Sequence, residues 1–406
     1  MLERGGVRFR LWARAHRQVS LALQSRNETL PMSPAADGWF EAFVSGCGAG
    51  ERYRFVLSDG RRIADPASRF QPEDVHGPSE VVDPSSYAWV HDWGWRLWDE
   101  ITLYELHVGA FTKEGTFAAA VQKTADLAAL GVTAIEIMPV GDFPGRWNWG
   151  YDGVLPFAPD TSYGAPDDFK ALVDAAHGHG VSVLLDVVYN HFGPEGNVWP
   201  LIAPDFFTER HKTAWGPAIN FGGPRSEAVR SFFIENAEYW LAEFNLDGLR
   251  LDAVHAIFDE SPVHILEELA KRVQSRFNRP VHLLLEHEDN DPALLVREGR
   301  EPVFYTAQWN DDIHHVLHVA ATGENEGYYA AYGGAKLLGR ATAEGFAYQG
   351  EKMPTRAKPR GGPSGFLPPE AFVAFIQNHD QIGNRAFGER LNTLTSSQAM
   401  RALVSV

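Results

Sequence analysis

The chain has 406 residues, 44% of them hydrophobic and 22% charged, so it can bury a sizeable core and form two or three domains. Its formal net charge of −17 disfavours nucleic acid and anionic membrane surfaces as partners. Cys47 is the single cysteine, which excludes a disulfide within the chain, and no apolar run predicts a signal peptide or a membrane span. We therefore expect a cytoplasmic globular protein, and its oligomeric state stays open.

Residues 1–90 predict a small all-β domain. Short alternating stretches, such as 7–13 and 53–57, are separated by turn residues. Strands of this length and spacing are typical of a β-sandwich. No catalytic group of residues occurs in this part. The Trp-rich segment 91–100 is expected to link it to the next domain.

From residue 101 onward the pattern changes to alternating strands and helices. The predicted strands are 101–111, 132–140, 181–191, 246–256, 281–288, 302–309 and 372–380, and helices are predicted at 117–130, 167–177, 226–243, 262–277, from Asp312 and from about Ser396. Strands that are apolar on both faces indicate a parallel sheet covered by helices. The fold class predicted for 101–406 is α/β, a (β/α)₈ TIM-type barrel that is apparently truncated before its eighth strand. Residues 322–371 are expected to form an irregular insertion, with Arg356, Lys358 and Arg360 in a solvated loop.

Polar residues gather where the apolar strands end. In a barrel of this type, these ends and the loops after them form the active site. Arg250 and Asp252 are two residues apart, so they point to the same side of a strand, and the guanidinium favours the ionised carboxylate. Such a carboxylate can attack an acetal carbon. The other polar residues at strand ends are Asp186, Asn190, His191, His255, Glu286, His379 and Asp380.

Cleavage of a glycosidic bond requires at least two carboxyl groups close together, and this group can supply them. Besides the nucleophile, a second carboxyl group must stay protonated and give its proton to the leaving oxygen. Glu286 ends an apolar run, where desolvation raises the pKa of a carboxyl group, so we prefer it to its neighbours Glu288, Asp289 and Asp291. Metal catalysis is the alternative use of these carboxylates and histidines. No H-x-H or H-x-x-x-H pair follows a strand, however, and we expect no metal and no cofactor.

Four segments resemble the signature regions of the α-amylase family of glycoside hydrolases: DVVYNH, GLRLDAVHA, LLLEHED and FIQNHD, in this order. The resemblance implies a retaining mechanism with Asp252 as nucleophile, Glu286 as general acid and base, and Asp380 as transition-state stabiliser. It also implies that Tyr151 stacks under the sugar at the cleavage site and that Asp186 supports the site. Arg250, Asn190, His191 and His379 are similar to residues that orient the nucleophile and hold this sugar.

Within this family, residues 232–257, 309–332 and 376–391 resemble the trehalohydrolase branch. That resemblance implies a maltooligosyl trehalose or related α-glucan as substrate, cleaved at the α-1,4 bond next to the terminal trehalose. Asp311 and Asp312 could line the site for the trehalose unit, or either could cap the helix that follows. Two alternatives stay open: a glucan branching enzyme with the same three carboxylates, and an inactive truncated fragment that binds glucans.

Overall fold

The computed structural model describes residues 1–405, which form two compact units. Unit 1 comprises Met1–Leu249 and Ala256–Val281, and unit 2 comprises Arg250–His255 and the described chain from His282 onward. Among the described residues, no helix combines the length and the apolar character needed to cross a membrane.

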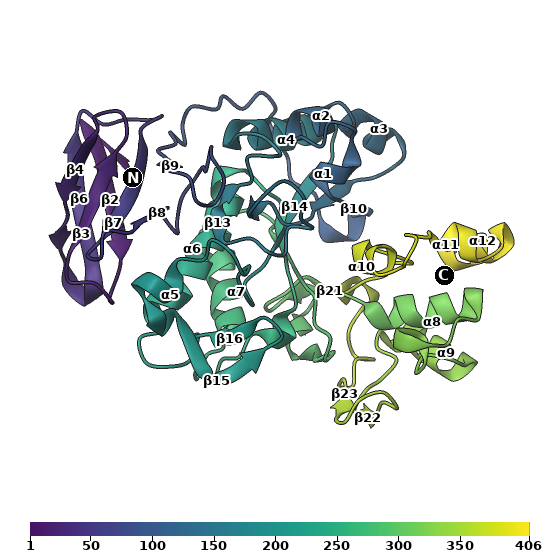
Figure 1. Ribbon diagram of the computed structural model, residues 1–406. Helices are drawn as coiled ribbons and strands as arrows, with labels where there is room; N and C mark the ends of the chain where they lie inside the picture. The colour runs from purple at the N-terminus through teal and green to yellow at the C-terminus, as the bar shows by residue number, and fades with distance from the viewer. Residues whose placement is uncertain (406) are drawn as a thin grey trace. The chain divides into compact units, whose positions relative to one another are not determined.

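The first part of unit 1 is the all-β domain that the sequence predicts (Figure 1). All of its strand pairs are antiparallel, and alternate side chains such as Phe9, Leu21 and Phe55 are buried in its core. One sheet has the order β1 (Leu2–Glu3), β2 (Gly6–Trp12), β6 (Trp39–Ser45) and β5 (Ser33–Pro34). The other has the order β4 (Glu28–Pro31), β3 (Val19–Leu23), β7 (Arg52–Leu57) and β8 (Arg62–Ile63), and β9 (Ser79–Glu80) also pairs with β7.

A seven-stranded sheet carries the strands predicted from residue 101 onward. Its order is β10 (Leu103–Leu106), β11 (Ala134–Ile137), β14 (Ser182–Val187), β17 (Gly248–Leu251), β18 (His282–Leu285), β21 (Ala307–Trp309) and β24 (Phe372–Val373). Pairs such as β10–β11, β11–β14 and β21–β24 are parallel. Neighbours follow chain order, as in the wall of a TIM-type barrel, whereas a doubly wound sheet reverses its order. The predicted fold class is confirmed for these seven strands.

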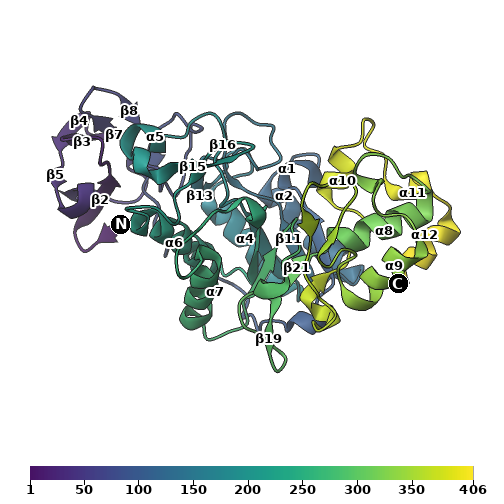
Figure 2. The same cartoon turned by 90° about the horizontal axis from the view of Figure 1, so that it is seen from below.

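The remaining elements of unit 1 are helices and two hairpins. The helices are α1 (Val108–Phe111), α2 (Phe117–Val121), α3 (Thr124–Ala129), α4 (Pro166–Gly178), α5 (Trp199–Ile202), α6 (Glu227–Glu243) and α7 (Ile265–Arg276); the hairpins are β12 (Gly141–Asp142) with β13 (Leu155–Pro159) and β15 (Phe207–Thr213) with β16 (Gly216–Ile219). The side chain of Thr116 accepts a hydrogen bond from the Ala119 amide at 3.2 Å and caps α2, just before the predicted start of this helix at residue 117. The predicted helix 117–130 is interrupted at Gln122 and Lys123, which separate α2 from α3. Helices α6 and α7 lie side by side (Figure 2).

Unit 2 contains more regular structure than the sequence predicts. Its further elements are β19 (Arg297–Glu298), β20 (Glu301–Pro302), α8 (Asp311–Thr322), α9 (Ala335–Glu344), β22 (Glu351–Lys352), β23 (Pro359–Arg360), α10 (His379–Gly383), α11 (Leu391–Leu394) and α12 (Ser397–Val404). The prediction that 322–371 is irregular is wrong for α9 and for the β22–β23 hairpin. Helix α9 is short and amphipathic, and Ala341 packs with Ile313 and Leu317 of α8 in one apolar cluster. The predicted strand 372–380 is also too long, because the chain leaves the sheet after Val373 and enters α10.

Candidate active site

Arg250 lies at the centre of the site residues in unit 2. Its side chain is 2% exposed. Nη1 donates to Oδ1 of Asp252 at 3.0 Å, which is the contact that their spacing predicts, and Nη2 lies 2.9 Å from Oε2 of Glu286. Since both contacts start from one guanidinium group, the two carboxyl groups lie close together.

Glu286 follows β18 and is held by the segment after β17. Its amide donates to the carbonyl of Leu251 at 3.0 Å, and the amide of Ala253 donates to Oε2 at 2.9 Å. Burial raises the pKa of Glu286, but the charge of Arg250, the Ala253 amide and a hydrogen bond with the Asp252 side chain lower it below its ordinary value. The expectation of a raised pKa is therefore wrong, because the strand end that removes water also places Glu286 on Arg250. A hydrogen bond between two carboxyl groups needs one proton, so one of the two must be protonated when this contact forms.

Ala253 has an unusual backbone conformation beside the nucleophile candidate. Its φ is 41°, in the left-handed region that residues other than glycine rarely adopt. This conformation costs about 1–2 kcal/mol for an L-residue. It persists because the amide of Ala253 is bonded to Glu286, and it orients that carboxyl group.

Asp380 lies in the first turn of α10, where a capping box fixes the backbone. The side chain of Asn378 accepts a hydrogen bond from the Asp380 amide at 3.0 Å, and the side chain of Gln381 accepts one from the Asn378 amide at 2.8 Å. Nε2 of His379 lies 3.7 Å from Oδ1 of Asp380. The predicted pair of His379 and Asp380 is thus placed by a helix start and not by a strand end.

A cavity of about 710 Å³ opens beside Glu286 within unit 2. Burial, with smaller contributions from the charges of Glu286 and Asp380, raises the pKa of Asp311 to about 7. Asp311 therefore carries a proton below neutral pH and can donate it in a hydrogen bond to a hydroxyl group. Residues that line the cavity include Glu286, Glu288, Asp311, Tyr328, Tyr332 and Asp380.

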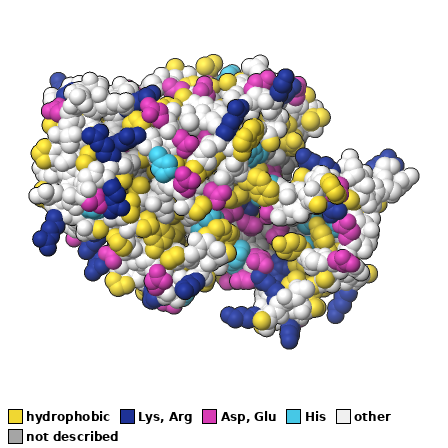
Figure 3. Space-filling model, in the orientation of Figure 1, with side chains coloured by type: hydrophobic (Ala, Val, Ile, Leu, Met, Phe, Trp, Pro, Cys, Tyr) yellow, Lys and Arg dark blue, Asp and Glu magenta, His cyan; other side chains and the backbone are white. Residues whose placement is uncertain are grey.

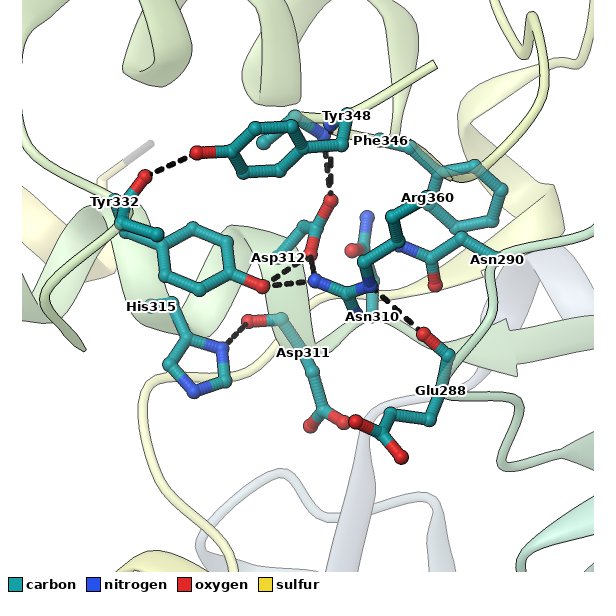
Figure 4. Close-up of polar contacts among 12 residues, drawn as sticks. Glu288, Asn290, Asn310, Asp311, Asp312, His315, Tyr332, Phe346, Tyr348 and Arg360 are labelled. Carbon is teal, nitrogen blue, oxygen red and sulfur yellow. Dashed lines mark hydrogen bonds and ion pairs between the residues drawn. The ribbon is translucent and has the colours of Figure 1, made fainter. Parts of the chain in front are cut away.

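Asp311 and Asp312 have different surroundings. Asn310 caps α8, because its side chain accepts a hydrogen bond from the Ile313 amide at 3.2 Å, so neither aspartate is the cap. The capping alternative is therefore wrong for both. The Asp311 carboxylate points to the side where the Glu288 side chain lies, whereas that of Asp312 points the other way (Figure 4). Of the two, only Asp311 lines the cavity.

Unit 1 brings together the other predicted substrate residues. The hydroxyl of Tyr151 donates to Oδ2 of Asp186 at 2.8 Å, and Nε2 of His191 contacts the Tyr151 carbonyl oxygen at 2.9 Å. Nδ1 of His191 contacts Oδ1 of Asn190. Burial lowers the pKa of His191, so its imidazole is neutral at pH 7. The ring of His191 stacks on Trp215 with centroids 4.1 Å apart.

Two contacts, one in each unit, were not predicted from the sequence. Trp215 lies between β15 and β16, and an isolated tryptophan in a polar segment gives no signal of its partner. Arg356, expected in a solvated loop, contacts Oε1 of Glu288 at 2.6 Å and Oδ1 of Asp289 at 2.9 Å. Lys and Arg side chains gather over the β22–β23 hairpin, beside acidic ones (Figure 3). The segments around Arg356 and Glu288 carry opposite charges in the sequence. These charges do not reveal which basic side chain contacts which acidic one.

Two protein-family models, two known proteins and a solved structure are similar to this chain. The model "Alpha amylase, catalytic domain" matches residues 54–202, and "Carbohydrate-binding module 48 (Isoamylase N-terminal domain)" matches residues 1–71. Malto-oligosyltrehalose trehalohydrolase from Saccharolobus solfataricus is 43% identical over 401 residues, which are 98% of this chain and 70% of that protein. A solved structure of a putative alpha amylase from Salmonella typhimurium is 50% identical, with a TM-score of 0.96 over 100% of this chain and 69% of that one. A 1,4-alpha-glucan branching enzyme from Streptomyces avermitilis is 36% identical over 272 residues, 61% of this chain and 45% of that protein.

Proposed function

We propose, from the premise that this chain belongs to the malto-oligosyltrehalose trehalohydrolases of the α-amylase family, that it hydrolyses maltooligosyl trehalose. The bond cleaved is the α-1,4-glucosidic bond next to the terminal trehalose, and trehalose is released. The observation that carries the proposal is the pairing of Asp252 and Glu286 on one buried guanidinium group. The branching enzyme is the weaker reading, because its similarity covers 61% of this chain.

Membership of the α-amylase family implies a retaining mechanism, and the shared guanidinium, which keeps the two carboxyl groups close together, agrees with it. Retaining glycosidases hold their two carboxyl groups about 5 Å apart, whereas inverting ones leave room for a water molecule between carboxylate and sugar. Asp252 attacks the anomeric carbon and forms a covalent glycosyl ester while Glu286 gives its proton to the leaving oxygen. Glu286 then takes a proton from the water that hydrolyses the ester and frees Asp252. Asp380, beside the same cavity, stabilises the positive charge on the sugar in both transition states.

The proton shared by the two carboxyl groups has a required location before the first step. It must reside on Glu286, and Asp252 must carry the charge. The contact of 3.0 Å between Arg250 and Asp252 favours the ionised nucleophile, but Nη2 of the same guanidinium lies 2.9 Å from Glu286 and favours the ionised form of that group as well. The substrate therefore has to replace the contact between Arg250 and Glu286 before the proton is transferred.

The cavity beside Glu286 suits the leaving group. The general acid stands on the leaving-group side, and the cavity is lined by Glu286 and Asp311, whereas Asp252 is absent from its lining. We assign this cavity to the trehalose end of the substrate, with Asp311 as a hydrogen-bond donor. In the same proposal Tyr151, Asn190, His191 and His379 hold the sugar whose bond is cleaved.

The proposal also includes the domain boundaries of the chain and its location in the cell. We propose an N-terminal β-sandwich over 1–90, a linker over 91–100 and a catalytic domain over 101–406, with the insertion 322–371. The match of the carbohydrate-binding module model to residues 1–71 supports an N-terminal domain of this kind. A cytoplasmic location agrees with the single cysteine of the chain.

Product analysis tests the proposed function. We expect trehalose and maltotriose from maltotriosyl trehalose, and little change in maltohexaose, by anion-exchange chromatography. Asp252→Ala and Glu286→Gln should each lower the rate at least about a hundredfold. Asp289→Asn is the control, because Asp289 pairs with Arg356 and does not line the cavity. Branched glucans among the products would point to a transferase, and a control variant as impaired as Glu286→Gln would shift the acid to Asp289.

A further inference from the structure

A buried polar cluster lies behind the cavity wall in unit 2, and the proposed mechanism does not use it. Asp312, which is 0% exposed, is its centre (Figure 4). Its Oδ1 accepts hydrogen bonds from Nη1 of Arg360 at 2.6 Å and from the hydroxyl of Tyr332 at 3.0 Å. Its Oδ2 accepts from the amides of Ala347 at 2.8 Å and Tyr348 at 3.3 Å. This carboxylate therefore has a partner for each oxygen and a counter-charge.

The partners of Asp312 come from different segments of the chain. Asp312 lies in the first turn of α8, Tyr332 precedes α9, Ala347 follows α9, and Arg360 ends β23. Nε of Arg360 also donates to the carbonyl of Glu288 at 2.8 Å, in the segment after β18. One carboxylate thus connects α8 with the segments on both sides of α9, with the β22–β23 hairpin and, through Arg360, with the chain beyond Glu286.

These segments form the wall of the cavity. Tyr332, Arg360 and Glu288 line it, and Asp312 does not. His315 stacks on Tyr332 with ring centroids 4.5 Å apart, and its Nδ1 lies 2.6 Å from the carbonyl oxygen of Asp311. A shift of Tyr332 is therefore transmitted to His315 and to the turn that carries Asp311.

We propose that Asp312 is a positioning residue that fixes the cavity wall around the trehalose end of the substrate, an inference that rests on the proposed function. Asp312 touches no reacting atom and acts through Tyr332 and Arg360. Replacement by asparagine keeps the volume of the side chain, but it leaves the Arg360 guanidinium buried without its counter-charge. The wall then relaxes, which weakens substrate binding more than it slows the chemical steps at Asp252 and Glu286.

Asp259→Asn is a control for the general effect of neutralising a buried aspartate that pairs with an arginine. Its side chain is also 0% exposed, and its Oδ2 pairs with Nη1 of Arg230 at 2.5 Å. It accepts hydrogen bonds from the amides of Ser261 at 2.9 Å and Ile265 at 2.7 Å. Asp259 belongs to unit 1 and does not line the cavity. Asp259→Asn therefore removes a buried ion pair elsewhere, and Arg230 keeps Glu268, whose Oε2 lies 2.5 Å from its Nη2, as a second counter-charge.

The first measurement is steady-state hydrolysis of maltotriosyl trehalose by the whole chain. In Asp312→Asn we expect KM to rise about tenfold or more while kcat changes less than about threefold. The reason is that a displaced cavity wall lowers the affinity for the substrate more than it lowers the rate of bond cleavage. In Asp259→Asn we expect both constants to stay within about twofold of wild type. An unchanged KM in Asp312→Asn, or an equal rise in Asp259→Asn, would overturn the proposal.

Hydrogen–deuterium exchange gives a readout that does not depend on activity. Exchange should become faster at residues 346–348 and 359–362 in Asp312→Asn and stay unchanged there in Asp259→Asn. Unchanged exchange in Asp312→Asn would refute the positioning role even if the protein hydrolyses another glucan. If Asp312→Asn does not fold, Tyr332→Phe removes one hydroxyl from the cluster and keeps the ring, and KM should rise about threefold. A KM equal to that of wild type in this variant would equally refute the proposal.

Discussion

Asp311 is the carboxyl group of the cavity whose titration lies near neutral pH. Its pKa of about 7 is raised by burial and by the charges of Glu286 and Asp380. As the pH rises through this value, Asp311 loses the proton it would donate to the substrate and adds a negative charge beside the catalytic carboxyl groups. We therefore expect kcat/KM of the wild type to fall above about pH 7.

Asp311→Asn tests this assignment, because the amide keeps a hydrogen-bond donor at every pH. We expect kcat/KM of the variant to lie within about fivefold of wild type at pH 6 and to fall less steeply above pH 7. The measurement is kcat/KM between pH 5 and pH 9. Superimposable alkaline limbs in the two profiles would assign the decline to another group.

The residues of the site show what a sequence can and cannot predict at this scale. The pair of Arg250 and Asp252 follows from a spacing of two on one strand, which is local information. The direction of the Glu286 pKa shift depends on the second nitrogen of the same guanidinium, and hence on how β18 pairs with β17. Desolvation at Glu286 acts in the expected direction, but its side chain is 19% exposed and its charged neighbour comes from another part of the chain.

At the scale of elements, α8 depends on a side chain with two functions. Asn310 caps the helix through Oδ1, and its Nδ2 donates to the carbonyl of Gly345 at 2.7 Å, at the end of α9. Asn310→Ala removes both bonds, and we expect a loss of about 2 kcal/mol or more in the free energy of unfolding.

Chemical denaturation gives the free energy of unfolding of Asn310→Ala, and a variant at a helix cap that makes a single bond is the control. Ser396 caps α12 by accepting from the Ala399 amide at 3.2 Å, and this bond is its capping contact. Ser396→Ala should cost about 1 kcal/mol. Equal losses in the two variants would show that the bond to Gly345 contributes nothing to stability.

The elements that were predicted well are those whose signals are local. Thr116 and Ser396 cap helices whose starts were predicted at residue 117 and at about Ser396, because a cap is set by neighbours along the chain. Helix α9 was missed because its apolar residues Leu337, Leu338 and Ala341 are few and a glycine lies among them. Such a helix is stabilised by its contact with α8, which the sequence does not reveal.

At the scale of the whole molecule, charge should have little effect on substrate capture. The chain carries a formal net charge of −17, but a glucan has no charge for this field to steer. We expect kcat/KM at pH 6 to change less than about twofold between 20 and 300 mM NaCl. A steep dependence on salt would instead indicate that surface ion pairs such as Arg356 with Glu288 control access to the cavity.

The order of the strands was predictable across the whole sheet, because each apolar strand is followed by polar residues and, in most cases, a helix. The division of the chain into two units was not. It passes within β17, between Leu249 and Arg250, where no change in composition marks it. A boundary of this kind depends on which parts of the chain pack together, and that is decided by long-range contacts.

The acidic lining of the cavity has a consequence for inhibitors. Glu286, Glu288 and Asp380 lie around it, and Asp311 gains a negative charge as the pH passes about 7. A basic sugar mimic, with a protonated nitrogen in place of the ring oxygen, gains a further counter-ion at that point. Its affinity should therefore rise over the same pH range in which hydrolysis falls, so that the most effective conditions for inhibition and for turnover differ.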